Sequence, residues 1–210
     1  MISLSEILHT IAQALMIPCL IILIILMAGA VWQIGDIVVE YIAERRKHKC
    51  NVPQLLRDVH AAGADGLAEL IENSGLLRRQ KKALLELAES RGLPKDTLTA
   101  LAERLLATEE ARNACTTSIT DMIAKLGPMF GLLGTLIPLG PGIVALGQGD
   151  TVTLSESMNV AFDTTIAGVI SAAVASVISH IRKRWYNDDM VSLETLMEAV
   201  LEEVTGDVEG

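Results

Sequence analysis

Asp163 is the acidic residue whose position suggests chemistry, because it lies well inside an apolar stretch of the chain. It follows Glu156 by seven residues, which is about 10 Å along a helix that rises 1.5 Å per residue. An ionisable group at such a depth in a membrane usually faces the bundle interior or water and marks an ion path. A structural hydrogen bond, or a side chain that reaches back to the outer surface, is the alternative reading.

Hydroxyl side chains accompany this acid. Thr164 and Thr165 follow it directly, and Ser171, Ser176 and Ser179 lie further along the same stretch. Hydroxyls in a membrane helix often donate back to their own backbone, which explains most such residues without any function. We nevertheless expect function to reside among the small polar residues of this stretch and of the apolar segment before it.

Two apolar segments, 126–147 and 157–181, are separated by a short polar loop at 148–156. Each is long enough to cross a hydrocarbon core of roughly 30 Å, which takes about 20 helical residues. The sequence therefore predicts a transmembrane helical hairpin. A third span is predicted over 11–34, where Pro18 can kink the helix.

Glycine and proline punctuate the first segment of the hairpin. Small residues let two helix backbones approach closely in a membrane, so the glycines predict a helix-packing seam. The prolines are expected to bend or break this span, either as kinks relieved by packing or as a functional hinge. The residues concerned are Gly127, Gly131 and Gly134, with Pro128, Pro138 and Pro141.

The distribution of charge predicts how the chain crosses the membrane. Lys and Arg are confined to 45–125 and 182–184. The positive-inside rule then places the N-terminus outside and the C-terminus in the cytoplasm. The predicted organisation is an N-terminal span within 1–44, a cytoplasmic helical region 45–125, the hairpin 126–181 and a cytoplasmic helix 182–210.

Within the cytoplasmic region, apolar residues recur at helical spacing. Short helices are predicted over 53–63 and 64–73, another over 76–90, and a long one from Lys95 that runs into the second span. The tail after Tyr186 is predicted to form an amphipathic helix. The fold class is thus an all-α integral membrane protein, with three transmembrane helices and long cytoplasmic helical extensions in an oligomeric bundle.

Composition limits the function classes. A net charge of −9 argues against nucleic-acid binding, and the three cysteines and four histidines show no metal-ligand spacing. The region 45–125 contains no Gly-rich phosphate loop, nucleophile motif or metal cluster, so an enzyme is not expected. No cofactor and no metal are predicted.

The motifs GLLGTLIP (131–138) and AFDTTIAG (161–168) resemble the MotA/TolQ/ExbB proton channel family, and three spans with an external N-terminus resemble its TolQ/ExbB branch. The resemblance implies a pentamer in the cytoplasmic (inner) membrane whose second and third spans line a central pore. It also implies a smaller ExbD/TolR-like partner with a single span, whose membrane aspartate carries the proton.

By this resemblance, Thr135 and Thr165 line the ion path, with Gly168 as the glycine of the third-span motif. Thr164 and Asp163 join them as candidate pathway residues, and Asp163 occupies a position that is usually apolar in the TolQ/ExbB branch. The function implied is the channel subunit of a motor driven by the proton-motive force. A sodium-driven stator and a non-conducting membrane scaffold are the alternatives.

Overall fold

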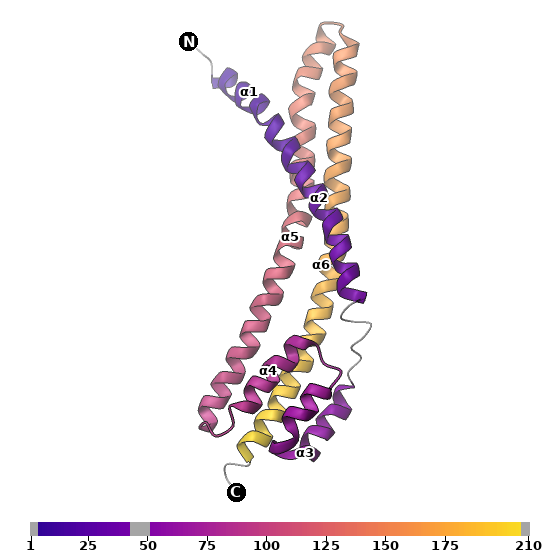
Figure 1. Ribbon diagram of the computed structural model, residues 1–210. Helices are drawn as coiled ribbons and strands as arrows, with labels where there is room; N and C mark the ends of the chain where they lie inside the picture. Colours follow the sequence, from indigo (N-terminus) through magenta and orange to yellow (C-terminus); the bar gives the residue numbers. More distant parts are fainter. Residues whose placement is uncertain (1–3, 43–50, 207–210) are drawn as a thin grey trace. The chain divides into compact units, whose positions relative to one another are not determined.

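The computed structural model describes residues 4–42 and 51–206, and these residues include six α-helices (Figure 1). The helices are α1 (Leu4–Ala14), α2 (Met16–Glu40), α3 (Val52–Asn73), α4 (Arg78–Glu89), α5 (Lys95–Gly147) and α6 (Thr151–Gly206). The predicted all-α fold is confirmed for this part of the chain. The basic residues Arg45, Arg46, Lys47 and Lys49, used above to predict orientation, lie outside the described residues.

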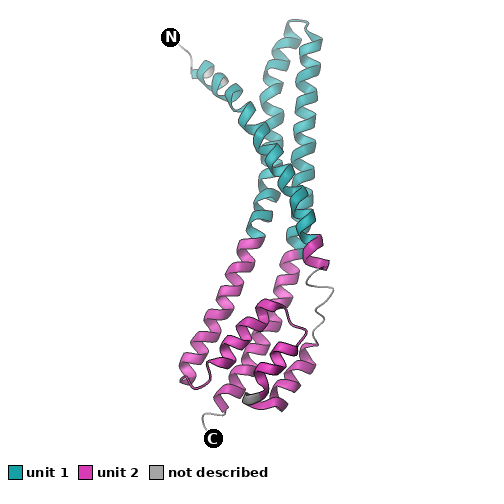
Figure 2. Ribbon diagram, in the orientation of Figure 1, with its two compact units in different colours: residues 1–37, 117–181 teal, residues 38–116, 182–210 magenta. Residues whose placement is uncertain are grey.

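Within residues 4–42 and 51–206, three helical stretches are long and apolar enough to cross a membrane, namely Glu6–Glu40, Lys95–Gly147 and Thr151–Gly206. They contain the three predicted spans. The chain divides into two compact units, which Figure 2 colours separately. Unit 1 comprises residues 1–37 and 117–181, and unit 2 comprises residues 38–116 and 182–210.

Unit 2 is a helical bundle around an apolar core. Leu84 and Leu87 of α4 are buried together with Leu98 of α5 and Val200 of α6. The apolar positions predicted for the helix at 76–90 and for the C-terminal tail are thus confirmed as core. The predicted break in α3 is also confirmed, because Gly63 has φ 62° and ψ 179° inside the helix. Glycine adopts this backbone conformation without the steric cost that a Cβ would bring.

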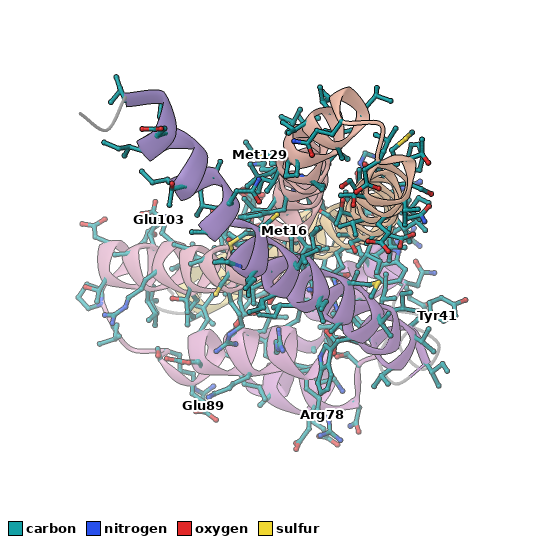
Figure 3. The ribbon with its side chains drawn as sticks, turned by 90° about the horizontal axis from the view of Figure 1, so that it is seen from above. Met16, Tyr41, Arg78, Glu89, Glu103 and Met129 are labelled. Carbon is teal, nitrogen blue, oxygen red and sulfur yellow. The ribbon has the colours of Figure 1, made fainter. Side chains whose placement is uncertain are left out.

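Unit 1 contains α1, most of α2 and the hairpin formed by the later part of α5 and the earlier part of α6. Helix α2 packs on the hairpin through two apolar clusters. Leu26 and Ala30 are buried against Ile123 and Ala175 in one cluster. The other, which holds Cys19, Leu23 and Ile137, is covered by partly buried residues that include Met16, labelled in Figure 3.

The first span is interrupted near the predicted kink. Helix α1 ends at Ala14, four residues before Pro18, and α2 begins at Met16, two residues before it. Proline lacks the N–H that would bond to the carbonyl four residues earlier, and its ring crowds that carbonyl. For Pro18 that carbonyl belongs to Ala14, so the break falls where the proline removes the hydrogen bond.

Two expectations about the hairpin need correction. Pro128, Pro138 and Pro141 do not break the second span, because α5 continues through all three. The loop is also shorter than predicted, since α6 already begins at Thr151. Asp150 ends the loop by accepting hydrogen bonds from the backbone N–H groups of residues 152 and 153, which caps the helix.

Candidate ion pathway in the membrane hairpin

Glycines allow the backbones of α5 and α6 to touch. A Cβ built on Gly168 would lie 2.5 Å from the carbonyl oxygen of Gly127, and one on Gly127 would lie 2.7 Å from the carbonyl oxygen of Gly168. Gly131 faces the Cα of Gly168, and Gly134 faces the side chain of Thr164. The two helices can therefore keep this separation only with glycine at the closest points.

These contacts define an antiparallel register. Gly127 contacts Ala172, Gly131 contacts Gly168 and Gly142 contacts Ser157, so a step forward along α5 matches an equal step back along α6. Thr135 follows Gly131 by four residues, and Thr165 precedes Gly168 by three. The register therefore brings these two threonines to the same level of the hairpin.

Helical geometry also places both threonines on one side of the hairpin. Helix α2 packs on the opposite side, where Val174 belongs to the cluster around Leu26 and where the Cys19 thiol contacts the carbonyl oxygen of Phe130 at 3.5 Å. At 100° per residue, Thr165 lies about 180° around α6 from Val174, and Thr135 lies about 140° around α5 from Phe130. We call the side that carries Thr135 and Thr165 the threonine flank.

The hydroxyl groups on the threonine flank are half-buried and donate to their own helices. Thr135 Oγ1 donates to the carbonyl oxygen of Leu132 at 2.7 Å, and Thr165 Oγ1 donates to that of Ala161 at 3.1 Å. A hydroxyl whose proton is used in this way keeps lone pairs that can accept a further hydrogen bond or contact a cation. The flank therefore offers oxygen acceptors rather than donors.

Thr164 is placed differently from its neighbour. Its side chain is buried in the glycine seam against Gly134, and its hydroxyl donates to the carbonyl oxygens of Val160 and Ala161 at 3.0 and 2.9 Å. It therefore fills the contact between the two helices and lies inside the seam.

The structure does not place Asp163 on the threonine flank with Thr135 and Thr165. Two residues along a helix correspond to about 200°, so Asp163 and Thr165 point to nearly opposite sides of α6. Asp163 is exposed on the same side as Val174, which is the side of the hairpin where α2 packs. One ion cannot contact Asp163 and Thr165 of the same helix. This separation follows from residue spacing alone, and the sequence analysis missed it.

The structure also shows a polar contact that the sequence analysis did not single out. The Ser179 hydroxyl of α6 donates a hydrogen bond to Asp121 Oδ1 of α5, within unit 1. Sequence reasoning assigned Asp121 to a cytoplasmic helix and Ser179 to a backbone-bonded hydroxyl. Among the described residues, no group of three or more His, Cys, Asp or Glu side chains is arranged to hold a metal ion.

Comparison with known proteins identifies the family. A sequence model of the MotA/TolQ/ExbB proton channel family matches residues 70–195, which is more than half of the chain. The chain belongs to the MotA/TolQ/ExbB family. The matched region covers α4, α5 and most of α6, and so includes the glycine seam and the threonine flank. No curated protein matches the chain. As a MotA/TolQ/ExbB protein with three apolar helices, the chain is a membrane protein of a channel-type family and not of an enzyme family.

Proposed function

We propose that this chain is the channel-forming subunit of a motor driven by the proton-motive force, in the TolQ/ExbB branch of its family. The subunit would assemble as a homopentamer and couple ion flow to movement of a smaller, single-span ExbD/TolR-like partner. The observation that carries this proposal is the position of Thr135 and Thr165. They lie at one level on the flank away from α2, so several copies with this flank turned inward would line one opening with hydroxyl oxygens.

The energetics support an ion-driven machine. One elementary charge that crosses 100 mV releases about 2.3 kcal/mol, so a few ions per step can move one bundle within another. The glycine seam draws α5 and α6 together without bulky side chains at the closest points, so the two helices can move as one packed pair. Thr135 and Thr165 would solvate the passing ion through their free lone pairs.

The separation of Asp163 from Thr165 favours a proton over sodium. Hard cations are held by several oxygen ligands, carboxylates among them. At the level of the threonines, this flank offers hydroxyl oxygens, whereas Asp163 lies about 160° away around α6. A proton needs only a chain of acceptors, which hydroxyls and water provide.

The proposed location is the cytoplasmic (inner) membrane, with the N-terminus outside. Residues 45–125 and the tail 182–210 would then lie in the cytoplasm, because they contain all the Lys and Arg of the chain. The loop between α5 and α6 would face outward.

Proton flux into liposomes tests the proposal. The full chain, purified with the proposed single-span partner, is reconstituted with a pH-sensitive dye inside, and a potassium gradient with valinomycin sets the potential. Thr165→Val and Thr135→Val should each reduce flux by at least about tenfold without changing the assembly on size exclusion, because each removes an oxygen acceptor from the wall.

Thr108→Val is the matched control, since it also removes a hydroxyl that donates to its own α5 backbone, at Arg104, but lies in unit 2. Flux that survives both pathway substitutions would contradict the role of the threonines. Absence of flux in the wild type would favour a scaffold, and flux that requires sodium would favour a sodium-driven stator.

A further inference from the structure

Asp163 is an acid on the surface of the membrane hairpin, on the side away from the threonine flank. The register of the hairpin places it level with Leu136 of α5, which lies eleven residues after Lys125 and eleven before Gly147. At 1.5 Å per residue, Asp163 is therefore about 16 Å from either end of that apolar segment. A hydrocarbon core is roughly 30 Å thick, so the carboxyl group lies near its middle.

The described part of the chain supplies Asp163 with no partner. Its side chain is exposed, and within residues 4–42 and 51–206 it makes no hydrogen bond or ion pair. The sequence has no Lys or Arg in 1–44 or 126–181, so a second copy of the chain brings no Lys or Arg to this depth either. Long Lys and Arg side chains can reach from a membrane helix to the water interface, but the aspartate side chain is too short to do so.

The residues around Asp163 form an uncovered strip along α6. Glu156 and Asn159 precede it by seven and four residues, and Ile166 and Ile170 follow it by three and seven. At 100° per residue, all four lie within about 60° of Asp163 around the helix. All of them are exposed. We call this strip the Asp163 face.

Helix α2 covers the continuation of the Asp163 face but leaves the face itself open. Val174 lies one turn beyond Ile170 and packs in the cluster that contains Leu26 and Ala30 of α2. Ile166 and Ile170 are each more than half exposed. Association of helices in a membrane uses close apolar packing together with polar contacts between helices. The two isoleucines offer the packing, and the acid offers the polar contact.

We propose that the Asp163 face binds a membrane-spanning helix of another protein, which carries an Arg or Lys near the middle of its span. Charged groups inside a membrane pair with one another because an isolated charge there is costly. A cationic side chain opposite Asp163 neutralises it, and the amide oxygen of Asn159, one turn away, accepts a further hydrogen bond from the same cation.

This partner is distinct from a helix inside the opening lined by the threonine flank. Asp163 lies about 160° around α6 from Thr165, so the two sites are on nearly opposite sides of the helix. Binding at the Asp163 face requires that the hairpin lie in a membrane, but it does not depend on ion flow.

Synthetic membrane peptides test the charge pairing. The probe is a Leu/Ala helix of about 20 residues with one central Arg, and its control has Gln at that position. A central residue has the same depth whichever way the peptide inserts. The full chain carries a fluorescent protein at its C-terminus as the donor and is reconstituted in phosphatidylcholine vesicles with dye-labelled peptide. Energy transfer at increasing peptide-to-lipid ratios gives an apparent dissociation constant for each peptide.

We expect wild type to bind the Arg peptide at least about tenfold more tightly than the Gln peptide. Asp163→Asn should remove this preference, Asp163→Glu should keep it, and Asp163→Lys should instead favour a peptide with a central Glu. Glu156→Gln is the matched control, because it removes an acid from the same face near the loop. Ion pairs in contact with water are weak, so this control should keep the preference within about threefold.

Equal binding of the Arg and Gln peptides to wild type would overturn the proposal. A preference that persists in Asp163→Asn, or that Glu156→Gln abolishes, would also overturn it, because the cation would then bind elsewhere. Each preference is a ratio measured on one variant, so it does not depend on how much of that variant folds. Proton flux in the same vesicles separates the two proposals. An Arg preference without flux contradicts only the proposed function, and flux without an Arg preference contradicts only this inference.

Discussion

Replacing Gly168 by alanine tests the glycine seam most directly. The new Cβ would lie 2.5 Å from the carbonyl oxygen of Gly127 and 2.8 Å from the Cα of Gly131. Both neighbours are helix backbone, which cannot turn aside as a flexible side chain can. To restore ordinary contact at 3.4 Å, the two helices must separate by about 0.9 Å at this point.

The free-energy change combines two opposing terms. Overpacking in a well-packed contact costs about 1–3 kcal/mol, and contact with backbone on two sides places Gly168 at the upper end. Alanine offsets up to about 1 kcal/mol of this cost, since it is the better helix former. We therefore expect Gly168→Ala to lower the free energy of unfolding by about 2 kcal/mol.

The assay is the helical circular dichroism signal during titration of a detergent-solubilised sample with a denaturing detergent. Gly140→Ala is the matched control, because Gly140 lies in α5 and a Cβ there would meet nothing within 4 Å. That control should be neutral or slightly stabilising. Equal effects of the two substitutions would refute the claim that backbone contact at Gly168 sets the helix separation.

Two further predictions concern the cluster around Arg182 in unit 2. Arg182 is 2% exposed and its Nε donates to Glu40 Oε2 at 3.1 Å, so Arg182→Met, which leaves the carboxylate without this partner, should lower the free energy of unfolding by about 3 kcal/mol. Adding Glu40→Leu should recover most of the loss, and unchanged stability in the single variant would contradict the ion pair. Burial and the nearby Glu40 carboxylate raise the pKa of Tyr186 to about 12, so the folded state holds this proton more tightly than the unfolded state, where the pKa is about 10. Its stabilisation is therefore complete below pH 10 and is lost as pH rises from 10 to 12. The ultraviolet absorbance of tyrosinate should show a late-titrating phase that Tyr186→Phe removes, and persistence of that phase in the variant would assign it elsewhere.

Local signals were enough to predict most of the helices. The helical spacing of apolar residues predicted the helix at 76–90, whose Leu84 and Leu87 are buried, and the predicted boundary at Gly63 matches the break in α3, because each signal acts within a few residues. The continuous α5 also followed from the absence of a stop signal between Lys95 and Gly127. The three prolines were expected to bend or break the second span, and the break does not occur, since sequence alone does not show the packing that holds α5 together across them.

The candidate site was predicted less well, because it depends on two helices at once. The motifs gave Thr135 and Thr165, but the side of each helix that they occupy requires knowledge of where α2 packs. Arg182 was counted among the basic residues that predict the orientation of the chain, yet it is buried with Glu40, which precedes it by 142 residues. Partners so far apart in the chain leave no periodic signal.

The register of the hairpin connects the glycine seam to the polar pairs. Gly127, Gly131 and Gly168 touch through backbone atoms, so α5 cannot slide along α6 without creating a clash. A slip of one residue would shift the helices by 1.5 Å and turn the facing positions by about 100°. Thr135 and Thr165 would then no longer lie at the same height along the hairpin, and Asp121 would lose its hydrogen bond from Ser179. The small residues therefore do more than permit close packing, because they fix which polar groups meet along the flank.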